Sequence, residues 1–176
     1  RVVFSVNDID PRSKNLASKE FKKNKIKIKR FVLKDFAKDF YKSYLTQTSN
    51  EIPFIDAKIA ISKDFFTINK KKRWITNTKS RNLANFLRSK YDCLLTTSKT
   101  INYDNPLLNC RIEGLEKKSP ALIVLDRFFN IKKNSAVLKV KNRKIFILTN
   151  VKNTSKEKLL KRKGVKILKI GKINLH

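Results

Sequence analysis

Short apolar runs alternate with amphipathic segments along the first third of this chain. Residues 1–7 and 26–32 have the apolar spacing of strands, and residues 16–25 and 34–45 have that of helices. A polar connector over residues 46–51 follows, before Pro53 opens the next segment. The pattern predicts the end of one α/β domain, with a second domain after the connector.

In the second part, residues 55–62 alternate like a strand, and residues 74–76 form a short β-prone run. Asn77 is a favourable helix N-cap, and the apolar positions of residues 78–89 fall on one helical face. The remaining pattern predicts strands at 91–97, 121–126, 136–140, 144–149 and 165–170, a polar loop at 98–111, and a helix at 155–163 stopped by Gly164. Strands that alternate with helices, including the nearly continuous apolar run 121–126, predict an α/β fold with a parallel sheet.

The composition fits one ordinary domain or two small ones. Of the 176 residues, 40% are hydrophobic, which is enough for a packed core. No apolar run approaches the length of a membrane span. The chain contains no methionine and opens on Arg1 inside a strand-like run, so we expect a fragment of a longer protein.

The charge is strongly basic, with 43 Lys and Arg against 14 Asp and Glu, a net charge of +29. Such an excess raises the hypothesis of a basic nucleic-acid-binding α/β module. The lysines are, however, scattered along the whole chain, as a biased source composition would also produce. Nucleic-acid binding therefore stays the alternative.

The cysteine and histidine residues of the chain limit the kinds of metal and catalytic site that we expect. Cys93 and Cys110 have no metal-ligand spacing and make no disulfide framework, so we expect no metal and a reducing, cytoplasmic setting. The lone histidine, His176, leaves no triad based on histidine. The isolated glycines form neither a P-loop nor a dinucleotide fingerprint.

The stretch from residue 73 to 111 gathers the residues that favour a phosphorylated ligand. Arg88 and Arg111 offer planar forks of donors that match phosphate oxygens and stay charged. Trp74, Thr100 and Asp104 lie in the same stretch. Plainer interpretations stay open: a core tryptophan, a helix-capping Arg88 and an Asx turn at Asp104.

The order of these residues resembles the reductase domain of the bifunctional riboflavin-biosynthesis deaminase–reductase family. The resemblance is carried by Pro53-Phe54-Ile55, Lys58, Ala60, Ser62, Asp64, Trp74-Ile75-Thr76, Ser80-Arg81, Leu87-Arg88, Tyr91-Asp92, Thr100, Asp104-Asn105-Pro106-Leu107-Leu108, Arg111 and Ile123-Val124-Leu125-Asp126. Residues 1–48 are similar to the tail of that family's deaminase domain, and residues 52–176 to the first part of its reductase domain.

The resemblance implies a dihydrofolate-reductase-like α/β fold, incomplete at its C-terminus. It implies a cytoplasmic homo-oligomer that uses NADPH to reduce 5-amino-6-(5-phosphoribosylamino)uracil to its ribitylamino form. The cofactor would be contacted by Ala60, Trp74, Thr100 and Asp104, and Asp126 ends a strand where open α/β sheets place cofactors. Substrate would be held by Arg88, Leu108 and Arg111, with Lys58 reaching the ribose as the catalytic candidate.

Four departures from the family pattern stand out. Phe65 replaces a glycine, although a bulky residue adopts positive φ only at a cost. Lys72 takes the place of a substrate-contacting serine, and the chain stops at His176 before the family's later glycine-rich segment. The zinc-binding deaminase motif is missing, so zinc would belong to a part of the protein outside this chain. An inactive, degenerate copy is therefore a further alternative, and we expect poor independent stability.

Overall fold

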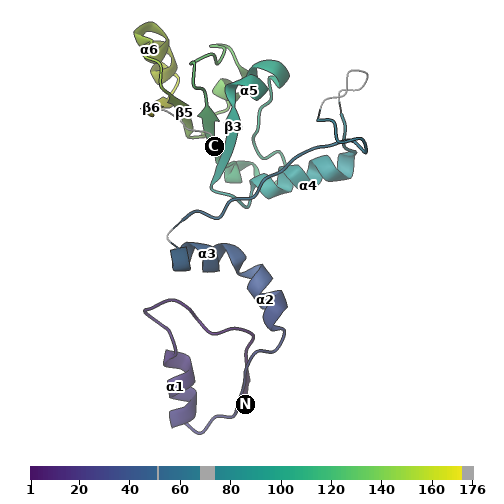
Figure 1. Ribbon diagram of the computed structural model, residues 1–176, viewed down its shortest axis with the longest axis vertical. Coiled ribbons are helices and arrows are strands. Elements are labelled where there is room, and N and C mark those ends of the chain that lie inside the picture. Colours follow the sequence, from purple (N-terminus) through teal and green to yellow (C-terminus); the bar gives the residue numbers. More distant parts are fainter. Residues whose placement is uncertain (51, 68–73, 172–176) are drawn as a thin grey trace. The chain divides into compact units, whose positions relative to one another are not determined.

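The computed structural model describes residues 1–50, 52–67 and 74–171 of the chain (Figure 1). It divides into two compact units, residues 1–58 and residues 59–176. Each unit has its own sheet, with two strands in the first and four in the second.

The first unit is a small parallel βα arrangement. Strands β1 (Val2–Val3) and β2 (Ile28–Lys29) pair in parallel, joined through α1 (Leu16–Lys23). Helices α2 (Lys34–Phe40) and α3 (Lys42–Asn50) follow. The strands predicted over residues 1–7 and 26–32 thus shrink to two residues each, because only that stretch finds a ladder partner.

The helix predicted over residues 34–45 is broken at Tyr41, and it also runs further than expected. Hydrogen bonding crosses the break, since Tyr41 N donates to Ala37 O at 2.9 Å and Leu45 N donates to Tyr41 O at 2.8 Å. Helix α3 continues to Asn50, so the polar connector predicted over residues 46–51 is wrong. Polar composition alone does not end a helix when no proline or glycine interrupts it.

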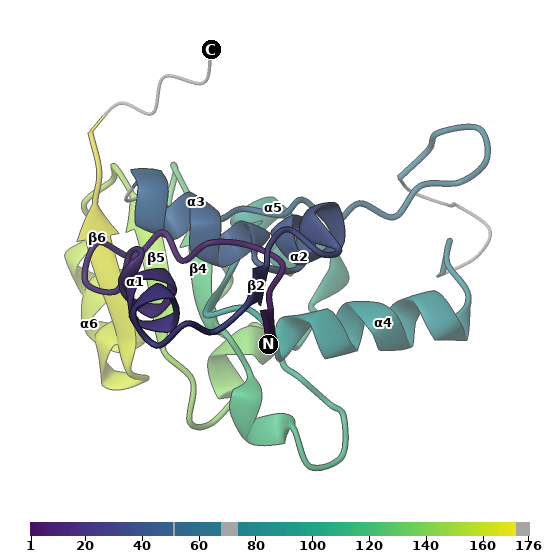
Figure 2. The ribbon, with the colours of Figure 1, turned by 90° about the horizontal axis from the view of Figure 1, so that it is seen from below.

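The second unit is built on a four-stranded parallel sheet. Its strands are β3 (Cys93–Thr97), β4 (Ala121–Leu125), β5 (Ile145–Thr149) and β6 (Val165–Lys169), in the order β3-β4-β5-β6. The helices are α4 (Thr78–Arg88), α5 (Ser98–Asp104) and α6 (Thr154–Arg162), with short 3₁₀ turns at η1 (Glu116–Lys118) and η2 (Ala136–Lys139). In both views α6 lies beside β5 and β6 (Figures 1 and 2). The predicted α/β class with a parallel sheet is confirmed.

The core lies on one face of this sheet. Leu122 and Val124 of β4 stand in register with Ile145 and Ile147 of β5, and all four are buried. Ile101 from α5 and Leu160 from α6 join the same cluster and are fully buried. Burying each such side chain contributes roughly 1.5–3 kcal/mol, so this cluster is the main source of stability in the unit.

Three predictions within the second unit are wrong in the type of element, and a fourth is wrong in burial. Residues 136–140 form the turn η2 because the buried Val137 and Leu138 fill the core without a ladder. The predicted loop 98–111 contains α5, since Thr97 Oγ1 caps its start by accepting from Thr100 N at 3.3 Å. Residues 74–76 have no strand, and β3 is half-exposed rather than buried because it is an edge strand.

Residues 55–62 form no strand either. Ile55, Ile59 and Ile61 are exposed, and no ladder partner occurs for them among the described residues. The segment ends in a tight turn in which Phe65 N donates to Ser62 O at 3.0 Å. Phe65 adopts a φ of 64° there, a left-handed conformation that glycine adopts more readily than a bulky residue.

Candidate functional site

The end of α4 brings together the two predicted substrate arginines. Asn77 begins the helix as predicted, because its Oδ1 accepts from Ser80 N at 2.9 Å. At the other end, Arg88 Nη1 donates to Asn109 O at 3.0 Å, which ties the helix to the segment that carries Arg111. The charge of Arg111 is close enough to act on Arg88: burial lowers the pKa of Arg88, and Arg111 lowers it further.

Asn85 connects these two arginines, and sequence reasoning missed it. Its Oδ1 accepts from Arg88 Nη1 at 3.3 Å and from Arg111 N at 3.2 Å. Asn85 precedes Arg88 by three positions, so both side chains lie on the same side of α4. That spacing is the one signal in the sequence that could have identified it.

A third arginine, Arg143, stands next to the pair and was also missed. Its Nε donates to Pro120 O at 2.9 Å, and its Nη1 donates to Leu107 O at 3.0 Å. Burial, and then the charge of Arg88, lower the pKa of Arg143 to about 10, so it remains protonated at neutral pH. Within a basic run of the sequence, nothing distinguished it from its neighbours.

Among the residues that the structure describes, no carboxylate compensates the charge of these three arginines. Within the described part of the chain, neither Arg88, Arg111 nor Arg143 forms an ion pair. Arg143 Nη2 and the nearby Asn109 Oδ1 are buried without a hydrogen-bond partner among the described residues. Arg88 and Arg143 are half-buried and Arg111 is exposed, and cations grouped without counter-charge among the described residues are suited to an anionic ligand such as a phosphate.

The segment from Leu107 to Arg111 holds the third predicted substrate residue, Leu108. Leu108 adopts a φ of 54° and packs against the core, while Cys110 is fully buried. Cys110 N donates to Ser119 Oγ at 3.0 Å. Beside the segment is a hollow of about 400 Å³, lined by Leu107, Asn109, Glu116, Lys117, Ser119, Lys139, Val140, Lys141 and Asn142.

The predicted cofactor residue Asp126 lies at the opposite end of the sheet from the arginines. Asp126 follows β4 and is 2% exposed. Its carboxylate accepts from Ser98 Oγ at 2.7 Å, from Asn130 N at 2.7 Å and from Ile131 N at 2.8 Å. These bonds fix the loop after β4, so Asp126 shapes this end of the sheet rather than offering a free carboxylate.

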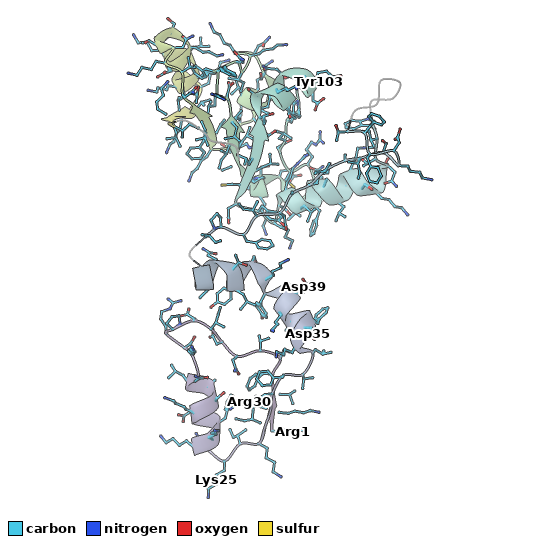
Figure 3. The ribbon with its side chains drawn as sticks, viewed as in Figure 1. Arg1, Lys25, Arg30, Asp35, Asp39 and Tyr103 are labelled. Carbon is cyan, nitrogen blue, oxygen red and sulfur yellow. The ribbon has the colours of Figure 1, made fainter. Side chains whose placement is uncertain are left out.

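A second hollow, of about 580 Å³, opens over the carboxyl ends of β3 and β4. It is lined by Thr97, Ser98, Lys99, Asn102, Tyr103, Asp126, Arg127, Phe128 and Asn130. Tyr103 projects from α5 and is mostly exposed (Figure 3). Thr100 and Asp104 belong to the same helix, yet neither lines the hollow. Open parallel sheets bind ligands outside the carboxyl ends of their strands, which is where this hollow lies.

The structure does not bring the two groups of predicted residues into one pocket. Pro120 and Arg143 precede β4 and β5, whereas Asp126 follows β4. A five-residue strand is about 17 Å long, which separates the arginines from the second hollow. Helix α5 and the segment after it run between these two ends.

The remaining predicted residues lie elsewhere. Trp74 is 54% exposed, so the interpretation as a core tryptophan is wrong, and the Arg81 guanidinium stands 4.9 Å from its ring centre. Ala60 is half-buried, and Lys58 is exposed at the end of the first unit. Lys72 lies outside the described residues.

No group of three or more His, Cys, Asp or Glu side chains in the described residues could hold a metal ion. None of the helices that the structure describes is long and apolar enough to cross a membrane.

Comparison with known proteins gives a family match. The family model described as the RibD C-terminal domain matches residues 53–176. The riboflavin biosynthesis protein RibD of Aquifex aeolicus is 28% identical over 177 residues, which is 99% of this chain and 49% of that protein. RibD of Buchnera aphidicola subsp. Baizongia pistaciae is 30% identical over 145 residues, covering 81% of this chain and 39% of that protein. The chain thus spans about half the length of the Aquifex relative and 39% of the length of the Buchnera relative.

A shorter relative and two solved structures extend this picture. The 5-amino-6-(5-phosphoribosylamino)uracil reductase of Buchnera aphidicola subsp. Acyrthosiphon pisum is 29% identical over 86 residues, 43% of this chain and 42% of that protein. The structure of a Thermotoga maritima diaminohydroxyphosphoribosylaminopyrimidine deaminase/5-amino-6-(5-phosphoribosylamino)uracil reductase matches with a TM-score of 0.74 at 24% identity, over 97% of this chain and 53% of that one. Acinetobacter baumannii RibD matches with a TM-score of 0.73 at 20% identity, over 98% of this chain and 48% of that one. The likeness is consistent with the expected dihydrofolate-reductase-like fold.

Proposed function

The chain belongs to the RibD C-terminal domain family, and from this membership we propose that it takes part in NADPH-dependent reduction of 5-amino-6-(5-phosphoribosylamino)uracil to the ribitylamino form. The observation that carries the proposal is the pair Arg88 and Arg111, which converge at the end of α4 without a carboxylate partner among the described residues. The substrate class named for a shorter relative carries a phosphate, the anion that such a pair recognises.

In this proposal the arginines bind and orient the substrate. Arg88 and Arg111 hold its phosphate, and their guanidinium groups stay charged throughout the physiological range. Leu108, three positions before Arg111 in the same segment, contacts the remainder of the substrate, and its backbone φ is 54°. Lys58 is assigned to the ribose as the catalytic candidate, and Lys72 is assigned to the substrate. Bound NADPH supplies the hydride, so the chain's own task is positioning and charge complementarity.

For the cofactor, the hollow over β3 and β4 offers the donor set that a dinucleotide phosphate requires. Lys99 and Arg127 supply cations at its rim, and Thr97 and Ser98 supply hydroxyl groups. We assign cofactor contacts to Ala60, Trp74, Thr100 and Asp104, with Asp126 holding the loop that forms the wall. A cofactor of this length would also cover the distance between this hollow and the arginines.

The domain arrangement is part of the same proposal. Residues 1–48 are assigned to the end of a deaminase domain and residues 52–176 to the reductase domain of a cytoplasmic, homo-oligomeric enzyme. No step of zinc-dependent deamination is assigned to this chain, since its described residues hold no group of metal ligands.

The test is an assay of substrate-dependent NADPH oxidation with the whole protein. Substitution of Arg88 or Arg111 by alanine should raise the KM for the phosphorylated substrate at least about ten-fold, because a charge-assisted phosphate contact is lost. Arg162, exposed at the end of α6, is the matched control, and Arg162→Ala should leave both KM values unchanged. A protein without NADPH oxidation, but with nucleic-acid affinity that falls steeply with salt, would favour the alternative raised by the charge of +29.

A further inference from the structure

The segment Leu107–Arg111, here called the substrate loop, is held at four points by residues outside it. Leu107 O accepts from Arg143 and Asn109 O accepts from Arg88, at 3.0 Å each. Cys110 N donates to Ser119 Oγ at 3.0 Å, and Arg111 N donates to Asn85 Oδ1 at 3.2 Å. The loop has no regular secondary structure of its own, so these bonds fix where Leu108 and Arg111 stand.

Arg143 makes the bond at the loop's first residue, and it does so from a rigid base. Its Nε donates at 2.9 Å to Pro120 O, directly before β4, while Nη1 reaches Leu107 O. A planar guanidinium presents these two donors at a fixed angle, so the distance between the two carbonyl groups is fixed as well. Arg143 thus connects Pro120, directly before β4, to Leu107, the residue next to Leu108 in the substrate loop.

The charge of Arg143 also acts on the site. Burial of Arg143, and then the charge of Arg88, lower its pKa, and its buried Nη2 has no hydrogen-bond partner within the described residues. The lost solvation of these cations is recovered when an anion binds beside them. Arg143 cannot contact that anion through Nη2, because this atom is shielded from solvent.

We propose that Arg143 is a positioning residue of the reductase site, which holds the substrate loop so that Leu108 and Arg111 meet the phosphorylated substrate together with Arg88. The inference rests on the proposed function for its substrate, and on the bonds to Pro120 and Leu107 for its geometry. Sequence reasoning assigned Arg143 no role.

Kinetics of the whole protein provide the first readout. Arg143→Met removes both the fork and the charge and should raise the KM for the phosphorylated substrate about ten-fold, since a charge-assisted bond to the loop is lost. Arg143→Lys keeps the charge but cannot span both carbonyl groups, so it should recover only part of this loss. The KM for NADPH should not change, and Arg162→Lys serves as the matched control.

The thiol of Cys110 provides a second readout that does not require activity. Cys110 is buried in the middle of the substrate loop, while Cys93 is exposed and can be replaced by serine. In this Cys93→Ser background, Arg143→Met should raise the rate at which a thiol reagent modifies Cys110 about ten-fold without global unfolding. Inorganic phosphate should slow the modification if the loop closes around an anion.

Each result decides a separate point. A rise in the substrate KM together with faster labelling of Cys110, at an unchanged melting temperature, would support the proposal. Unchanged labelling and an unchanged substrate KM in Arg143→Met would overturn it, as would an equal rise of both KM values with a lowered melting temperature, which indicates a merely structural role. If the unsubstituted protein oxidises no NADPH, the proposed function fails, and labelling of Cys110 still decides whether Arg143 holds the loop.

Discussion

Replacing Asn85 by aspartate should raise the free energy of unfolding and weaken substrate binding, so the two effects can be measured separately. The Asn85 Oδ1 lies 3.3 Å from Arg88 Nη1 and 3.2 Å from Arg111 N. A carboxylate in the same place would accept both bonds and would pair with the half-buried Arg88. At a partly exposed site such a pair adds about 1 kcal/mol or less to the free energy of unfolding.

The same carboxylate would neutralise the charge that the substrate phosphate needs. A charge-assisted bond between arginine and phosphate is worth roughly 1.5–3 kcal/mol, so Asn85→Asp should raise the substrate KM more than about ten-fold. Asn85→Ala should raise it less, about five-fold. It removes two bonds at the long end of the normal range, and the Arg111 N–H that it frees is exposed to water.

The assay pairs thermal unfolding with NADPH oxidation on the same preparations. Asn82 is an exposed residue one turn before Asn85 in α4, so Asn82→Asp controls for the effect of a new charge on the helix. A melting temperature that holds or rises while the substrate KM increases is expected of Asn85→Asp alone. If Asn85→Asp lowered the KM, or if Asn82→Asp matched its effect, the arginine pair would not be the phosphate site.

Three other substitutions test the fold around the site. Phe65→Gly should raise the free energy of unfolding by about 1 kcal/mol in urea titrations, since glycine adopts the φ of 64° without strain; destabilisation would contradict this. Asp126→Asn should lower it by about 2–4 kcal/mol, because an amide cannot accept all three bonds now made to the carboxylate, and an unchanged urea midpoint would refute that role. The bond from Lys169 holds the pKa of Glu157 below its ordinary 4.5, so stability from this pair is present above about pH 4.5 and is lost as the pH falls through the lowered pKa. Lys169→Met should flatten that acid dependence in melting curves, and an unaltered dependence would exclude the pair as its source.

The strongly patterned parts of the fold could be predicted from the sequence. Strands β4 and β5 are apolar along nearly their whole length, and they are the strands whose alternate residues form the core. Helix α4 has both an apolar face and a capping asparagine, so local chemistry and packing agree.

Other elements depended on contacts that no local pattern contains. Helix α5 is polar apart from Ile101, and it forms because that one side chain is fully buried and Thr97 caps its start. Residues 55–62 show the opposite case, since their alternation is genuine but a strand requires a neighbour to pair with, and none of the described residues provides one.

The candidate site likewise contains residues that the sequence pointed to and residues that it did not. Arg88 and Arg111 were candidates from the sequence because guanidinium groups match phosphate oxygens, and their role as substrate residues stays a prediction. Arg143 lies 36 positions from its partner Leu107, so its role exists only after β5 is placed beside β4. The bond between Asn85 and Arg111 could not be predicted either, because it depends on where the fold places Arg111.

The large positive charge and the arginine site are distinct properties of this chain. Most of the 43 cationic residues are lysines dispersed along the sequence, and an exposed cation is screened by salt and contributes little to any one contact. Arg88 and Arg143 differ because burial has already removed part of their hydration, which strengthens their attraction for an anion. Binding through the exposed lysines should therefore weaken steeply with salt, whereas binding at the arginines should depend on salt much less and on these particular side chains far more.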